Sequence, residues 1–260
     1  MNESIGNGER QLVPESSKEE EIQPPTIRLE FIRHDKRGDT VASYRGSRPT
    51  DWQAELGKPG RIHATEVGKT KNPNPEVAMA WGSMRNRAVE TAMKHMLAND
   101  PRVTQDTDLA TIRWMIDEEL AKGQKDNYTP LLDFNWNGTE RFNDEGYDSF
   151  EQKRALAFVL ERSDNLVQEV GDTESTSYTR AAANIAELIQ RYVLIHKNWN
   201  RIAQDNPDKY KKYGNELQRF LGSHQQVLES FLMKIIEQRN ELDSAVVARR
   251  EALDHAENAA

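Results

Sequence analysis

The chain of 260 residues contains no cysteine, which excludes disulfide bonds, thiolate metal sites and a cysteine nucleophile. It also lacks an apolar run long enough to span a bilayer. The first ten residues, MNESIGNGER, hold no basic stretch followed by an apolar core and so do not read as a secretory signal. We therefore expect a cytoplasmic protein without a membrane partner.

Basic residues are in the minority. The formal net charge is −8, so a broad basic face for nucleic acid is not expected, although a local basic pocket is compatible with this balance.

Hydrophobic residues make up 36% of the chain, and 260 residues suffice for one large domain with an insertion. Residues 1–25 are acidic and polar, with almost no apolar cluster, and are expected to form a disordered tail. Residues 26–260 are expected to form the domain.

Three short apolar segments have the character of strands. Residues 27–33 (IRLEFIR) alternate apolar and polar side chains, residues 77–81 are continuously apolar, and residues 216–224 (ELQRFLGSH) end in a histidine. A further strand near Val103 is a weaker expectation. Helices are predicted after the turn at residues 57–60 and over residues 87–97. Strands that alternate with helices indicate an α/β three-layer sandwich with a mainly parallel central sheet.

A large helical insertion is expected over residues 117–213. Residues 150–170 and 178–206 carry apolar side chains at helical spacing, and the Gly- and Asn-rich stretch 135–149 is expected to separate helical segments. The insertion should cover one side of the sheet. From Val227 onwards a long amphipathic helix continues into a highly charged C-terminal end.

Arg33 ends the first predicted strand, and His34 directly follows it. Ligands bind at strand ends in open α/β sheets, where loops converge over the sheet edge. A neutral, oriented histidine can act as a nucleophile, and an adjacent arginine offers a planar fork of donors for phosphate oxygens. Taken alone, however, an Arg-His pair more often lies in an exposed loop without a catalytic role.

Two later segments have the same setting. Arg87 would lie in the first turn of a helix, near backbone N–H groups that favour an anion, and Arg85 competes for this role. His224 stands between a predicted strand and a helix, where it could donate to a phosphoryl oxygen. An ordinary helix start and a loop histidine are the alternatives. The remaining histidines are expected on the surface: His63, His95, His196 and His255.

Together these segments resemble the histidine phosphatase superfamily, which includes the phosphoglycerate mutases. That family opens with a strand ending in Arg-His-Gly, followed by a Leu-x-x-x-Gly-x-x-Gln-Ala-x-x-x-Gly helix, a Ser then Arg-Ala-x-x-Thr-Ala block, and a late strand ending in His. In the same order this chain has Arg33-His34, then Leu56, Gly60, His63 in place of Gln, Ala64 and Gly68, then Ser83, Arg87, Ala88, Thr91 and Ala92, and finally Ser223-His224. The resemblance covers residues 27–97 and 216–236.

The resemblance implies a phosphoglycerate mutase-like fold and hydrolysis of phosphomonoesters through a phosphohistidine on His34. Arg33, Arg87 and His224 would surround the phosphoryl oxygens of a small phosphorylated substrate. No metal or cofactor is implied, and a homo-oligomer is left open. A mutase, or an inactive phosphate-binding or interaction protein of the same fold, is the alternative.

The general acid and the residue after the nucleophile depart from the family pattern. The family's carboxylate is not reproduced: Thr111 stands where the family has Glu, and Gln225 follows the late histidine. Glu118 is the substitute we expect, with a solvated helix start as the alternative. Asp35 replaces a small residue beside the nucleophile, where its charge would repel a phosphate or orient a nearby arginine.

Overall fold

The computed structural model describes residues 23–35, 53–118, 122, 125, 127–210, 213 and 215–257. Most of the expected tail and most of the polar loop after Asp35 lie outside these residues. None of the described helices combines the length and the apolar character needed to cross a membrane.

A small parallel sheet forms the centre of the molecule. Its strands are β1 (Thr26–Arg33), β2 (Ala78–Gly82) and β3 (Glu216–Ser223), in the order β1-β3-β2, and both pairings are parallel. The three predicted strands are therefore confirmed, with ends that differ by one residue. The strand expected near Val103 was wrong: residues 101–108 form turns, and Val103 packs its side chain into the core beside the helix that follows.

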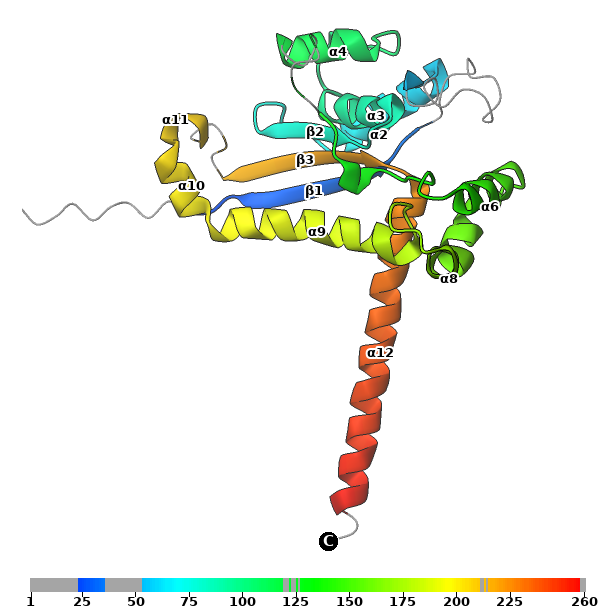
Figure 1. Ribbon diagram of the computed structural model, residues 1–260. Helices are drawn as coiled ribbons and strands as arrows, with labels where there is room; N and C mark the ends of the chain where they lie inside the picture. Colours follow the sequence, from blue (N-terminus) through cyan, green and yellow to red (C-terminus); the bar gives the residue numbers. More distant parts are fainter. Residues whose placement is uncertain are drawn as a thin grey trace, which may run out of the picture.

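Helices cover both faces of this sheet (Figure 1). On one face lie α2 (Lys58–Thr70), α3 (Asn86–Met96) and α4 (Leu109–Ile116), with Phe220 of β3 packed among residues of α3 and α4. On the other face α9 (Tyr178–Lys197) packs against Leu221, the next residue of β3. Successive side chains of a strand point to opposite faces, so Phe220 and Leu221 of β3 are buried on opposite faces of the sheet. The protein is thus a mixed α/β fold.

The region between α4 and β3 is helical, as predicted, but its breaks differ from the prediction. The 3₁₀ turn η1 (Pro130–Leu132) precedes α6 (Glu140–Glu151), α7 (Ala155–Ala157), the π-helix η2 (Phe158–Arg162) and α8 (Ser163–Val170), and α9 is followed by α10 (Trp199–Asp205) and α11 (Pro207–Tyr210). The stretch expected to separate helices contains α6, because Thr139 caps it by accepting from the Phe142 N–H.

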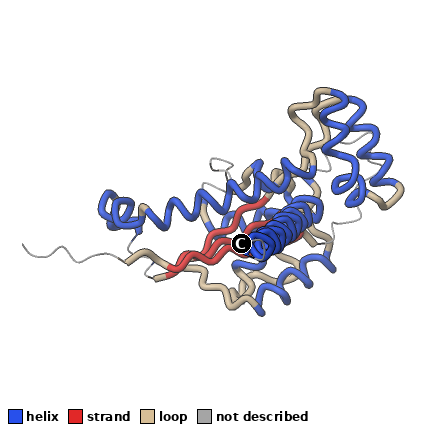
Figure 2. Tube along the Cα trace, turned by 90° about the horizontal axis from the view of Figure 1, so that it is seen from below, coloured by secondary structure: helices blue, strands red, loops and turns tan. Residues whose placement is uncertain are grey.

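The chain ends in α12 (Gln225–Glu257), which confirms the expected long helix. Its first turns pack against the sheet and α9 through Val227, Leu228 and Phe231. Its later part extends away from the other elements, and Figure 2 shows it end-on. The segment α6–α8 lies beyond the carboxyl ends of the strands, and α10 and α11 lie beyond the amino ends (Figure 1).

Close contact between β3 and α3 sets the distance of that helix from the sheet. A Cβ atom added at Gly222 would lie 2.0 Å from the carbonyl oxygen of Ala88. A Cβ atom added at Gly82 of β2 would lie 2.5 Å from the backbone nitrogen of Val89. Only glycine allows both strands to approach the first turns of α3 this closely.

We expect Gly222→Ala to lower the free energy of unfolding by about 3 kcal/mol, because the clash involves a backbone oxygen and α3 would have to move. Urea denaturation followed by circular dichroism measures the change. Gly171→Asn is the control, since nothing lies within 4 Å of an added Cβ there and asparagine tolerates its positive φ of 65°. Equal stability of the Gly222→Ala variant and the unaltered chain would contradict the close packing.

Candidate phosphate site

The three strand ends bring three polar side chains to one edge of the sheet. His34 follows β1, Ser83 follows β2 and His224 follows β3. The register pairs Arg33 with Ser223 and Gly82 with Gly222, and the backbone N–H groups of His34 and Ser83 donate to carbonyl groups at the end of β3 at 2.9 Å. The predicted meeting of His34 and His224 is thus present: their ring centroids are 5.0 Å apart, with the rings edge to face.

His34 is held in one tautomer. Its Nδ1 lies 2.9 Å from the carbonyl oxygen of Asp35, an acceptor only, so Nδ1 carries the proton and donates it. Nε2 therefore keeps its lone pair, and the Nε–H group of Arg87 donates toward it at 3.5 Å. Burial lowers the pKa of His34 to about 2, and the charges of His224, Arg87 and Arg33 act in the same direction. At neutral pH the ring is therefore uncharged, as a nitrogen nucleophile must be.

Arg87 and Arg85 occupy different places. Arg87 lies in the first turn of α3 and is 7% exposed, beside His34. Arg85 precedes the helix, and its Nε lies 3.6 Å from Asp133 Oδ1. Arg33 is exposed at the end of β1, next to His34.

His224 is buried among polar groups from two other segments. Its Nε2 lies 2.9 Å from Ser83 Oγ and 3.4 Å from Asp133 Oδ1. Burial lowers the pKa of His224 to about 4, with Arg85 and Arg87 adding to the effect and Asp133 opposing it. The ring is consequently neutral, and its orientation is fixed by Ser83.

Asp133 is a site residue that the sequence reasoning missed. It directly follows η1, and its Oδ1 is buried without a well-formed hydrogen bond. Burial opposes ionisation, but His224 and Arg85 hold the pKa of this carboxyl below its ordinary value. The available signal was a lone acid between Leu131-Leu132 and Phe134, since a carboxylate beside large apolar residues that are buried needs a charged or polar partner.

Glu118, the expected general acid, is placed differently. Its side chain is 69% exposed and forms an ion pair with Lys122 at 2.6 Å. Among the described residues no hydrogen bond or ion pair links it to His34, Arg87 or His224. The exposure and this ion pair agree with the alternative expectation of a solvated acid.

The histidines expected on the surface fall into two groups. His95 is 2% exposed, so that expectation was wrong: it lies on the face of α3 that packs against α2, and its Cα is 2.7 Å from the position of a Cβ added at Gly68. Burial lowers the pKa of His95 to about 4. His63 and His196 are exposed as expected. His255 lies in α12 beyond the side chains that are described.

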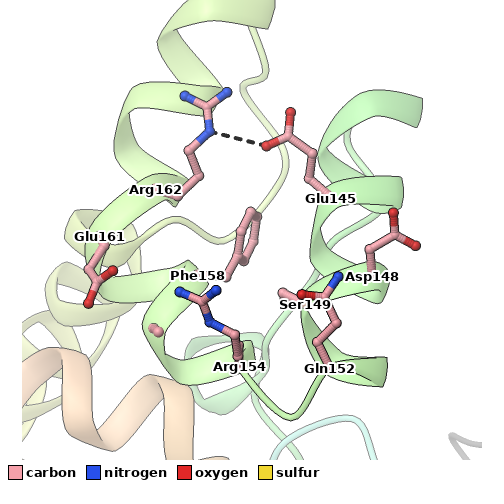
Figure 3. Close-up of a pocket in the computed structure, with 9 residues that line it drawn as sticks. Glu145, Asp148, Ser149, Gln152, Arg154, Phe158, Glu161 and Arg162 are labelled. Atoms are coloured by element: carbon pink, nitrogen blue, oxygen red, sulfur yellow. Dashed lines mark hydrogen bonds and ion pairs between the residues drawn. The ribbon is translucent and has the colours of Figure 1, made fainter.

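A separate hollow of about 290 Å³ lies between α6 and η2 (Figure 3). Arg162 and Glu145 form an ion pair across it at 3.1 Å, and Phe158 lies between them and Arg154. None of His34, Arg87 and His224 lines this hollow. Its lining mixes acids and bases, whereas the strand-end cluster carries an oriented, neutral imidazole beside an arginine, so the strand ends are the candidate site.

Comparison with known proteins adds no relative: no family model, no curated protein and no solved structure matches this chain.

Three imidazoles should remain neutral in mildly acidic solution. Because burial lowers the pKa of His34 to about 2 and those of His95 and His224 to about 4, their ring protons should keep the NMR shifts of neutral imidazole from pH 8 down to pH 5. The unfolded chain binds protons at these groups below about pH 6.5, so their contribution to stability falls as the pH drops through that value. A titration midpoint near 6.5 for any of the three would contradict the burial described.

Proposed function

We propose that this chain is a phosphatase that hydrolyses phosphomonoesters through a phosphohistidine on His34. The observation that carries the proposal is the state of that ring: Nδ1–H is held by the Asp35 carbonyl, while the Nε2 lone pair faces Arg87. The order of the four sequence blocks and the parallel strands support a phosphoglycerate mutase-like three-layer sandwich. We identify the substrate as a small phosphorylated molecule and invoke no metal or cofactor.

In the first step Nε2 of His34 attacks the phosphorus atom, and the bond from phosphorus to the ester oxygen breaks as the N–P bond forms. In the second step water attacks phosphorus, the N–P bond breaks, and inorganic phosphate leaves with His34 restored. Phosphoryl transfer depends mostly on positioning and on charge stabilisation. Arg87 and the exposed Arg33 supply N–H donors for the phosphoryl oxygens, and His224 adds one from Nδ1 in the tautomer in which Ser83 donates its hydroxyl proton to His224 Nε2.

Ser83, Arg85 and Asp133 support the site through His224. Ser83 and Asp133 contact the Nε2 edge of His224, and Arg85 compensates the buried carboxylate of Asp133. These contacts fix the His224 ring beside His34 before a substrate arrives. A preorganised group costs no reorganisation during the reaction, and this is the main source of electrostatic catalysis.

The leaving oxygen needs a proton unless it is a weak base. Glu118 is paired with Lys122 at the surface, and Asp133 is ionised at neutral pH. Aryl phosphates, whose phenolate leaving groups need little protonation, are therefore the substrates that test the nucleophile most directly. That neither Glu118 nor Asp133 is placed as a proton donor also favours a second candidate function, a phosphate-binding protein of this fold without turnover. Such a protein would bind phosphate but would not hydrolyse an aryl phosphate.

His34→Ala should abolish hydrolysis of p-nitrophenyl phosphate, a loss of about a thousandfold or more, because the covalent step requires Nε2. Protein labelled with ³²P and quenched in alkaline detergent should carry base-stable, acid-labile label on His34 in the unaltered chain only. His196→Ala, a change at an exposed histidine of α9, is the matched control and should keep full activity. Turnover that survives His34→Ala would reject His34 as the nucleophile.

Arg87→Ala should lower kcat/KM for the same substrate by about a hundredfold, since one charged donor to the transferring group is lost. Arg87→Lys should recover only part of this loss, because an ammonium group lacks the planar fork of donors. Arg191→Ala is the control: that arginine pairs with Glu187 on the exposed surface of α9. Equal activity of the Arg87→Ala and Arg191→Ala variants would show that Arg87 does not contact the phosphoryl group.

A further inference from the structure

The two departures from the family pattern nearest to the nucleophile are in contact with each other. Asp35 replaces a small residue directly after His34, and His63 replaces a glutamine in α2. In the folded chain Nδ1 of His63 lies 2.7 Å from Oδ1 of Asp35. Since a carboxylate only accepts, the ring donates this hydrogen bond. Two substitutions that are 28 residues apart in sequence therefore form one polar pair beside the nucleophile.

Asp35 is tied to three elements at once. Its carbonyl oxygen accepts from His34 Nδ1–H at 2.9 Å, and its own N–H group donates to Thr91 Oγ1 of α3 at 3.2 Å. Thr91 in turn donates to the carbonyl oxygen of Arg87 at 2.8 Å. With the backbone held in this way, the contact with His63 in α2 decides where the carboxylate points.

The direction of this carboxylate matters because the neighbouring site is meant for an anion. The side chain of Asp35 is 16% exposed, so solvent screens its charge only in part. Burial raises the pKa of Asp35, while His63 and Arg33 oppose the shift, so the surroundings disfavour an unpartnered carboxylate. Among the described residues, the charged or titratable groups that act on this carboxyl are Arg33 at the end of β1 and His63 in α2.

We infer that His63 is a positioning residue of the phosphate site: its hydrogen bond holds the Asp35 carboxylate toward α2, so that an anion can bind beside His34. The inference rests on the proposed function, because it concerns binding of a phosphoryl group at His34. His63 itself is 64% exposed, so its side chain contributes little to the core and its removal should leave the fold intact.

A four-protein cycle tests this role: the unaltered chain, H63A, D35N and H63A/D35N. The measurement is the Kd of inorganic phosphate by isothermal titration calorimetry, with circular dichroism to verify folding. H63A should weaken phosphate binding about tenfold, the effect of a carboxylate that is free to turn toward the anion. D35N should not weaken binding. H63A/D35N should bind as D35N does, because no charged carboxylate is left for His63 to position.

A conservative variant separates positioning from a general structural effect. H63Q keeps a hydrogen-bond donor and should bind phosphate more tightly than H63A, whereas the control H196Q should match the unaltered chain. An equal loss from H63A with and without D35N, or no loss at all, overturns the role of His63. Phosphate binding that follows the cycle without any aryl phosphatase turnover retains that role and rejects the hydrolase. Absence of phosphate binding in the unaltered chain rejects both.

Discussion

The parallel pairing of β1 and β2 with β3 sets the position of every group in the candidate site. Because the three strands end at one level, the residues that follow them meet at one edge of the sheet. The glycines at Gly82 and Gly222 then let α3 approach closely, which brings its first turn and Arg87 over the strand ends. A shift of register by one residue would turn His34 to the other face of the sheet and separate it from the other residues of the site.

Burial gives the cluster its chemical character. It keeps His34 and His224 uncharged, and Arg85 favours the ionised form of the buried Asp133. The cluster therefore combines a neutral imidazole with fixed positive charge, and the proposed transfer of a phosphoryl group to nitrogen requires both. The carboxylate of Asp35 opposes the binding of an anion, and we propose that its hydrogen bond with His63 holds it away.

Much of the fold could be predicted from local patterns. The three strands and the helices after residues 57 and 86 follow from apolar periodicity and from glycine and proline at their boundaries. The breaks within the helical region could not be predicted. The apolar spacing of residues 150–170 continues without interruption, although the chain there forms a turn and a π-helix. Phe158, the first residue of that π-helix, packs against Trp136. His95 was misplaced for a similar reason, since its burial depends on the approach of α2 at Gly68.

The sequence by itself determined which residues follow the strands, and so it identified His34, Arg87 and His224 as a group. It could do so because strand ends are local features, and parallel strands place them together. Only the tertiary structure decided which arginine faces His34, that Asp133 lies behind His224, that Glu118 remains at the surface, and that His63 reaches Asp35. These are contacts between segments far apart in the chain, and their geometry depends on how closely the helices pack on the sheet rather than on any local pattern.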